Sequence, residues 1–257
     1  MSDYEARFDG IRRLFSIDGL VRLRRAHVCV VGVGGVGSWA VEALARSGLG
    51  ALTLVDLDDI CVSNVNRQIH ALDGTFGRPK VEAMADRIRA INPGCSVTVV
   101  HAFFTESNAS DILGTRFDYV LDAIDSPSKK CLVIASCRER SIPVFVVGGA
   151  GGRRSPAALK IADLASSSHD RLLAAVRSEL RGNFGFPRGE TPFGIDCVFS
   201  PEPAIYPRSD GAVCEQREPD LSLRLDCGSG YGTACFVTGA FGFAAAGHIV
   251  QRIASGV

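Results

Sequence analysis

The sequence lacks the features that would place the protein in a membrane or outside the cell. Residues 1–13 are charged and contain no apolar segment of the kind that secretory signals need. The 28 Lys and Arg residues are balanced by 28 Asp and Glu residues, so the overall charge predicts neither membrane binding nor nucleic-acid binding. We therefore expect a cytoplasmic globular protein.

Paired cysteines are also missing, although the chain has nine cysteines. No two of them have the C-x-x-C spacing that is typical of structural zinc sites. Disulfide frameworks belong mainly to short secreted chains. We expect reduced thiols and no zinc.

A long uninterrupted hydrophobic run is absent too. The nearest approach is the segment 227–251, in which only His248 could carry a charge near neutral pH. Glycines interrupt this segment repeatedly, whereas a membrane span needs about 20 mostly apolar residues. The sequence therefore predicts a buried C-terminal helix over 236–254, and we expect no membrane association.

The sequence does contain a repeated alternation of short apolar segments with amphipathic ones. Segments rich in β-branched residues predict strands that are covered on both faces, and the segments between them predict helices. This alternation favours an α/β fold of the Rossmann-like, doubly wound type with a mainly parallel sheet. We expect strands at 27–31, 51–55, 96–100, 119–123 and 144–147, and helices at 38–47, 80–91 and 128–140.

A glycine-rich turn follows the first predicted strand and opens a helix. Gly32, Gly34 and Gly37, with Gly35 beside them, let backbone N–H groups at a helix start approach a phosphate. Asp56 ends the second predicted strand about 20 residues later, where a carboxylate can bind ribose hydroxyls. This pattern predicts a nucleotide without choosing between NAD and ATP, and glycine turns that bind nothing also occur.

The residues after Asp56 favour a triphosphate. Asp58, Asn64 and Arg67 follow in a polar segment, and Lys80 stands at the start of the next predicted helix. A guanidinium fork and an ammonium group can stabilise the charge on departing pyrophosphate, whereas a dehydrogenase has no need of them here. The structural alternative is a solvated loop followed by a surface lysine.

Asp125 follows the strand predicted at 119–123, at the edge of the sheet where ligands bind. A carboxylate there can hold Mg²⁺ on the nucleotide phosphates, because Mg²⁺ uses one or two carboxylates together with phosphate oxygens. Capping of the following helix by Asp125 or Ser126 is an equally good interpretation of its position.

As a set, these motifs resemble the ubiquitin-activating-enzyme-like adenylating superfamily over residues 7–150. The resemblance implies ATP, Mg²⁺ and an acyl-adenylate intermediate. It also implies a homodimer in which an N-terminal arginine enters the partner subunit's ATP site, and Arg13 is the candidate here, with Arg12 and Arg7 behind it. The resemblance also implies a set of nucleotide-binding residues, which are Gly32, Gly34, Gly35, Gly37, Asp56, Asp58, Asn64, Arg67, Lys80 and Asp125. The residues expected to be catalytic are Arg67, Lys80, Asp125 and Arg13.

Other segments are similar to one branch of this superfamily, the tRNA threonylcarbamoyladenosine dehydratases. They are Arg7–Phe15, Asp196–Pro203 and Gly228–Val237, and the C-x-x-C pairs of sulfur-carrier activators are absent. The branch implies a tRNA substrate that carries threonylcarbamoyladenosine. Its carboxylate would be adenylated, and its own carbamoyl nitrogen would then expel AMP and close a ring, with net loss of water. A monovalent cation and a cysteine-desulfurase or sulfur-acceptor partner also belong to this expectation.

The expected organisation follows from this resemblance. Residues 1–165 would form the ATP-binding adenylation core, which begins with a helical arm over 1–25. Residues 166–257 would form an irregular substrate and dimer region within the same globular unit, with a glycine- and proline-rich stretch over 182–232.

Three alternatives stay open at this point. The chain could adenylate a ubiquitin-like sulfur-carrier protein, or it could be a non-catalytic or NAD-binding module. A cysteine could serve as an acyl acceptor, although free cysteines are more often small core residues. The candidates for that role are Cys197, Cys214 and Cys227. The slight excess of basic residues over 151–190 permits an RNA-binding face but is equally typical of a solvated helix.

Overall fold

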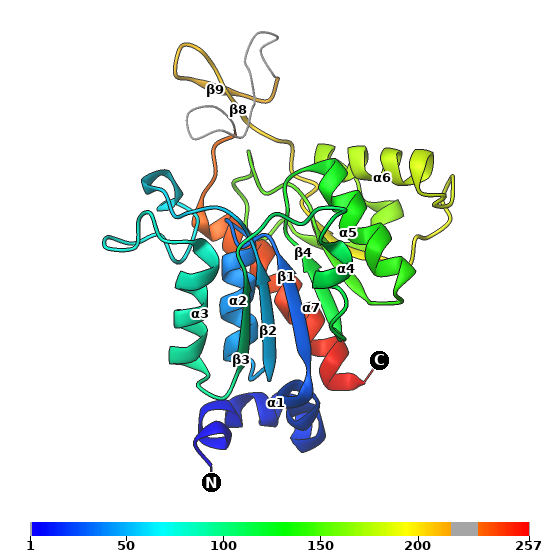
Figure 1. Cartoon of the computed structure of the whole chain (residues 1–257). Coiled ribbons are helices and arrows are strands. Elements are labelled where there is room, and N and C mark those ends of the chain that lie inside the picture. The colour runs from blue at the N-terminus through cyan, green and yellow to red at the C-terminus, as the bar shows by residue number, and fades with distance from the viewer. Residues whose placement is uncertain (1, 217–230, 257) are drawn as a thin grey trace.

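A seven-stranded sheet forms the centre of the molecule (Figure 1). The computed structural model describes residues 2–216 and 231–256. Six strands run parallel and β6 at one edge is antiparallel to β7, in the order β3-β2-β1-β4-β5-β7-β6. The strands are β1 His27–Val31, β2 Ala51–Val55, β3 Ser96–Val100, β4 Tyr119–Asp122, β5 Val144–Val147, β6 Lys160–Asp163 and β7 Asp196–Phe199.

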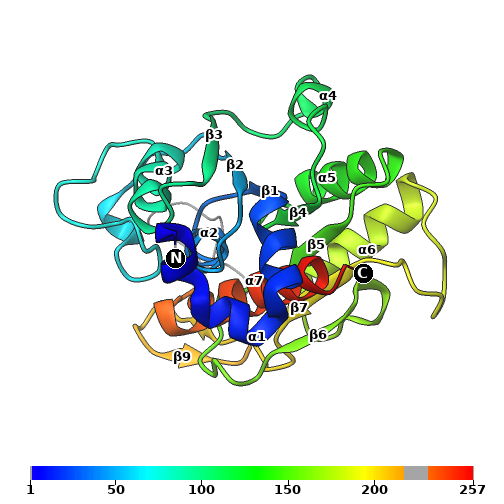
Figure 2. The same cartoon turned by 90° about the horizontal axis from the view of Figure 1, so that it is seen from below.

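Helices cover both faces of the sheet, as the alternating side chains of the strands require. Val28 and Val30 of β1 belong to the core under one helical layer, whereas Cys29 and Val31 belong to the core under the other. The first layer is α2 Gly37–Arg46, α3 Lys80–Ile91 and α7 Cys235–Ser255, and α1 Asp3–Arg25 packs against α7. The second layer is α4 Ala109–Ile112, α5 Pro127–Glu139 and α6 Arg171–Asn183 (Figure 2). The doubly wound prediction is confirmed.

Helix α1 lies at the amino ends of the strands, opposite the edge where the glycine-rich turn begins (Figure 1). It is bent at Phe8 and Ser16, and Ser16 has a φ of 69°. Arg22 donates to the carbonyl of Ala254 at the end of α7, over 2.8 Å from Nε. The expected helical arm is therefore attached to the last helix of the chain.

Strand β7 is the strand of the central sheet that the sequence did not predict. It lies between β5 and β6, so residues on both sides of position 165 contribute to one sheet. Its four residues, DCVF, stand in a stretch rich in glycine and proline, where local composition indicates a loop. The rest of the described stretch contains only the short pair β8 Tyr206–Pro207 and β9 Val213–Cys214. The short α4, β8 and β9 were not predicted either.

Helix α7 packs closely on α2. A Cβ atom at Gly242 would lie 2.7 Å from the carbonyl oxygen of Val36, so only glycine permits this approach. Phe241, Ala245 and Ile249 then enter the core with side chains of α2. The predicted buried C-terminal helix is confirmed, and no described helix is both long and apolar enough to cross a bilayer.

Candidate active site

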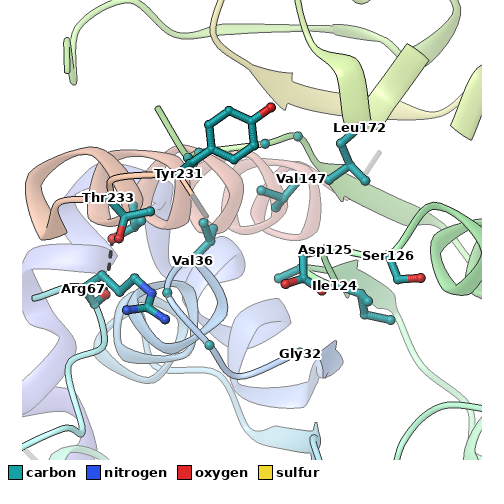
Figure 3. A pocket seen from close by; sticks show the side chains of 18 of the residues that line it. Gly32, Val36, Arg67, Ile124, Asp125, Ser126, Val147, Leu172, Tyr231 and Thr233 are labelled. Atoms are coloured by element: carbon teal, nitrogen blue, oxygen red, sulfur yellow. Dashed lines mark hydrogen bonds between the residues drawn. The ribbon is translucent and has the colours of Figure 1, made fainter. Parts of the chain in front are cut away.

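A cleft with a volume of about 1850 Å³ opens at the carboxyl ends of the strands. This volume exceeds the 300–1,000 Å³ or so of a typical small-molecule site, so the cleft can hold a nucleotide and part of a second reactant. Figure 3 shows the side chains of Arg67 and Asp125 on opposite sides of this space, with Gly32 between them and with Tyr231 and Thr233 above.

The glycine-rich turn forms the floor of the cleft. Gly32 has a φ of +90°, and a Cβ there would lie 2.9 Å from the backbone of Ala123. A Cβ at Gly37 would lie 1.8 Å from the carbonyl oxygen of Gly32, so these two glycines are required by the turn itself. Gly34 and Gly35 line the cleft without such clashes. Their backbone is thus open to a ligand at the start of α2.

Asp56 holds the turn in place from the end of β2. One carboxylate oxygen accepts the N–H of Val33 over 2.7 Å, and the other accepts the N–H of Asp58 over 2.9 Å. A carboxylate has about four lone-pair sites, so capacity for ribose hydroxyls remains on its two oxygens. The predicted ribose ligand therefore also positions the phosphate loop.

Lys80 reaches the cleft from the first residue of α3. Its side chain is only 7% exposed, and Nζ lies 2.7 Å from Oδ2 of Asp58. The backbone N–H of Lys80 also donates to the carbonyl of Asp58, over 3.0 Å. Asp58 therefore orients an ammonium group that has two further N–H donors for phosphate oxygens.

Asn64 and Arg67 occupy the loop between β2 and α3. Oδ1 of Asn64 accepts the N–H of Cys61 over 3.0 Å, and no described residue takes up its side-chain NH₂. One guanidinium nitrogen of Arg67 donates to the carbonyl of Ser63 over 2.6 Å, which leaves the other donors of its fork toward the cleft. The backbone carbonyl of Arg67 accepts the indole N–H of Trp39 over 2.9 Å.

Asp125 stands after β4 with an exposed side chain that lines the cleft. Ser126 is the N-cap residue of α5, yet its side chain makes no capping hydrogen bond. Close to Asp125 in sequence, Asp122 and Lys130 form a fully buried ion pair, with 3.1 Å between Nζ of Lys130 and Oδ2 of Asp122. Burial raises the pKa of Asp122, and the charge of Lys130 opposes that shift. The loop that carries Asp125 is thus anchored in the interior while its carboxylate stays free for a ligand.

Most of the predicted residues therefore meet in one place, but Arg13 does not. Arg13 lies on α1 with its side chain 75% exposed, and it pairs with Asp9 over 2.5 Å. Because α1 is at the other end of the sheet, Arg13 cannot reach the cleft of its own chain. Its assignment to a partner's site stays a prediction.

Of the candidate cysteines, Cys197 and Cys214 are not among the residues that line the cleft, and Cys227 lies outside the described residues. Cys197 is fully buried in β7, and burial raises its pKa to about 12, so little of it can be a thiolate nucleophile. Cys214 belongs to β9. Cys61, which lines the cleft, was not among the candidates.

The structure brings three further groups to the site, and sequence reasoning gave none of them an individual role there; Arg153 had been counted only among the basic residues of 151–190. Two are the buried Lys130 and the buried His70, whose Nε2 lies 2.9 Å from the carbonyl of Val33 in the glycine turn. The third is Arg153, which is 6% exposed and lines the cleft after β5. The run of glycines before Arg153 was the one local signal that could have indicated a ligand-facing loop.

Comparison with known proteins adds a family to this geometry. The model of the ThiF family matches residues 9–171. A tRNA threonylcarbamoyladenosine dehydratase of Haemophilus influenzae is 46% identical over 98% of this chain and 95% of its own length. Its counterpart in Escherichia coli is 47% identical over 97% of this chain and 94% of its own length.

A solved structure extends the likeness to the whole chain. The E. coli tRNA N6-threonylcarbamoyladenosine dehydratase in complex with ATP has a TM-score of 0.88 and 44% identity, over 99% of this chain and 97% of that one. By contrast, the molybdopterin-synthase adenylyltransferase of E. coli is 36% identical over only 56% of each chain. The sulfur-carrier alternative therefore has the more distant relatives.

Proposed function

This chain belongs to the ThiF family and, within it, to the tRNA threonylcarbamoyladenosine dehydratases, and from that membership we propose how its residues carry out the reaction. It uses ATP to cyclise threonylcarbamoyladenosine next to the anticodon of tRNA, with loss of water. The observation that carries the proposal is one cleft that combines an open phosphate turn with Arg67, Lys80 and Asp125.

In the first step, the carboxylate of the modification attacks the α-phosphorus of ATP and the bond to the β-phosphate breaks. Gly34 and Gly35 offer backbone N–H groups at the start of α2, and Asp56 binds the ribose. Arg67 and Lys80 stabilise the charge that develops on the departing pyrophosphate. Asp58 holds Lys80 in place for this role.

The carboxylates of the cleft would hold Mg²⁺ only when the nucleotide phosphates supply the other ligands. No described group of three or more His, Cys, Asp or Glu side chains is arranged to hold a metal ion by itself. The carboxylate of Asp125 has no protein partner in the described chain and faces the cleft. We assign Asp125 as the ligand of Mg²⁺, which would neutralise phosphate charge when bound.

In the second step, the carbamoyl nitrogen of the same side chain attacks the carbonyl carbon of the acyl-adenylate. The bond to AMP breaks, the nitrogen loses its proton, and the carboxylate oxygen leaves with AMP. Because nucleophile and electrophile belong to one substituent, their effective concentration is high without a protein nucleophile. The buried state of Cys197 supports a route without that thiol.

Arg13 enters the reaction only if two chains associate. We infer a homodimer in which Arg13 of one protomer reaches the ATP site of its partner, since it cannot reach its own. A tRNA substrate and the unpaired thiols of the described cysteines support action in the cytoplasm.

The proposed function is tested by incubating the protein with ATP, Mg²⁺ and tRNA that carries the linear modification. Mass spectrometry of the nucleosides should show loss of one water, with AMP and pyrophosphate formed in equal amounts. tRNA without the modification should support neither product. Absence of the mass change, together with adenylation of a carrier protein ending in Gly-Gly, would favour the sulfur-carrier alternative.

A further inference from the structure

The cleft continues past the nucleotide residues toward β5 and β7. The residues assigned to ATP follow β1, β2 and β4, whereas this second part is formed by the loop after β5, the start of α6 and the segments 203–207 and 231–233. Neighbouring strands lie about 4.8 Å apart, so its centre is roughly 10 Å from the phosphate turn. Its cations are Arg153, Arg171 and Arg177, and its acid is Asp170; Lys129 and Glu215 line other parts of the same cleft.

Arg153 is the unusual member of this set. The residue is 94% buried, and its Nε and Nη1 have no hydrogen-bond partner in the part of the chain that the structure describes. Among the described residues, the guanidinium donates from Nη2 to the carbonyl of His169, over 2.7 Å. A buried guanidinium with unmet donors costs free energy unless an acceptor arrives, which favours an anionic ligand at this position.

The loops around Arg153 are built to fix its position. His169, whose carbonyl accepts from Arg153, has a left-handed backbone with a φ of 57°. On the other side, Gly152 accepts the N–H of Ile205 and donates to Gly232, each over 2.8 Å. Thus His169 holds one end of the guanidinium, and two further segments distant in sequence fix the backbone that precedes Arg153.

Aromatic rings lie beside these cations. The rings of Tyr206 and Tyr231 have centroids 5.3 Å apart, and Arg171 lies over the Tyr206 ring at 5.3 Å. Unstacked RNA bases commonly bind on aromatic and guanidinium surfaces. Cation and ring together therefore form the kind of surface on which an unstacked nucleotide base binds.

No ion pair or hydrogen bond joins Asp170 to Arg153 among the described residues, and both Asp170 oxygens contact backbone N–H groups instead. One accepts the N–H of Gly149 over 2.7 Å, and the other caps α6 through the N–H of Leu173 over 2.9 Å. Arg177 donates to the hydroxyl of Ser167. Among the cations of this part, Arg153 is the buried one whose donors are left over.

We propose that Arg153 forms a second anion subsite, which binds an oxyanion of the modified nucleotide and positions it toward the ATP-bound half of the cleft. This inference rests on the proposed function. Two oxyanions have the required chemistry, the carboxylate of the modification and a phosphate of the anticodon backbone. Arg153 would thus bind the tRNA substrate directly and would have no part in holding ATP.

The test compares Arg153→Gln and Arg153→Lys with Arg154→Gln. Arg154 is the adjacent arginine, but its side chain is exposed and outside the lining of the cleft. Loss of charged hydrogen bonds to one oxyanion should lower kcat/KM for modified tRNA about 10- to 100-fold in Arg153→Gln. Arg153→Lys should recover part of the loss, and Arg154→Gln should keep the wild-type value. The Kd for ATP should be unchanged in all three.

Binding of tRNA with and without the modification distinguishes the two oxyanions. If the carboxylate is bound, Arg153→Gln weakens binding of modified tRNA alone. If a phosphate is bound, both tRNAs lose affinity equally. In that case the slope of the logarithm of the binding constant against the logarithm of salt concentration also decreases in magnitude by about one.

The proposal is overturned if Arg153→Gln keeps the wild-type kcat/KM for tRNA, or if it weakens ATP binding as much as it weakens the reaction. Should Arg153→Gln melt at a much lower temperature, the same two comparisons are made with Arg153→Lys, which keeps the charge. A wild-type protein that does not dehydrate modified tRNA would instead contradict the proposed function, so the two failures can be told apart.

Discussion

Lys80 and Arg67 illustrate two ways in which single side chains are prepared for phosphate. The Lys80 side chain is 7% exposed and held by Asp58, whereas Arg67 is half-buried and anchored by one nitrogen to the carbonyl of Ser63. The first provides a fixed point charge and the second a planar fork.

Lys80→Met should therefore abolish most activity while leaving the fold intact. Removal of one preorganised charge from a reacting centre typically costs about 10²–10³ in rate, and Asp58 stays solvated because its side chain is 55% exposed. The measurement is the single-turnover rate of AMP formation, with the melting temperature recorded beside it. Arg89→Gln, which removes a surface cation of the same helix, is the control and should keep the wild-type rate.

His70 makes stability depend on pH. Burial lowers its pKa, so the folded protein keeps this imidazole neutral at pH values where the unfolded chain already binds a proton. Stability should fall as pH drops below about 6.5, the ordinary value for histidine. Urea unfolding at about pH 7.5 and 5.5 measures this fall.

His70→Gln can keep a donor for the Val33 carbonyl but cannot titrate. Its loss of unfolding free energy between the two pH values should be smaller than that of the wild type. An equal loss in both proteins would assign the effect to other groups, such as His27 and His248, whose pKa values burial also lowers.

At this scale the sequence identified the residues whose positions are set by local motifs. Asp56 directly follows a strand and Lys80 opens a helix, so the fold alone brings them to one edge. Arg153 was different, because the hydrogen bonds that hold it and the preceding Gly152 come from residues 169, 205 and 232, which are far away along the chain. No local pattern carries that information.

At the scale of elements, the connection from β1 to α2 combines a structural glycine with a functional one. A Cβ at Gly37 would overlap the Gly32 carbonyl at 1.8 Å, whereas a Cβ at Gly34 has its nearest neighbour at 3.9 Å. Gly37→Ala should therefore lower the melting temperature strongly, while Gly34→Ala should leave it nearly unchanged and weaken ATP binding. Thermal unfolding and ATP titration of both variants check this separation; a strongly destabilised Gly34→Ala would contradict it.

Helices and strands whose hydrophobic residues recur at regular spacing were predicted almost to the residue. The helix over 80–91 and the strands over 96–100 and 144–147 have the expected bounds, because their apolar spacing decides both type and length. Strand β7 was missed because its four residues, which lie between irregular segments, are too few to show a regular spacing of hydrophobic residues. Its place between β5 and β6 is determined by pairing partners on both sides.

At the scale of the whole molecule, the proposed dimer makes a prediction about mixed subunits. Arg13→Ala and Lys80→Ala should each be inactive alone. If Arg13 acts in the partner's site, mixed dimers contain one intact site, and random mixing should restore about a quarter of wild-type activity. If each chain serves its own site, mixing should restore nothing. AMP formation after mixing and re-equilibration of the two variants is the measurement.

The docking of α7 on α2 also has a consequence for synthesis of the chain. Residues 37–46 leave the ribosome long before residues 235–255, which cover their apolar face. Likewise β5 acquires its outer neighbour only after β7 has been made. A nascent chain that ends near residue 171, where the family match stops, would expose both surfaces. Such intermediates aggregate easily, so translation of this protein should rely on chaperones until its final helix has emerged.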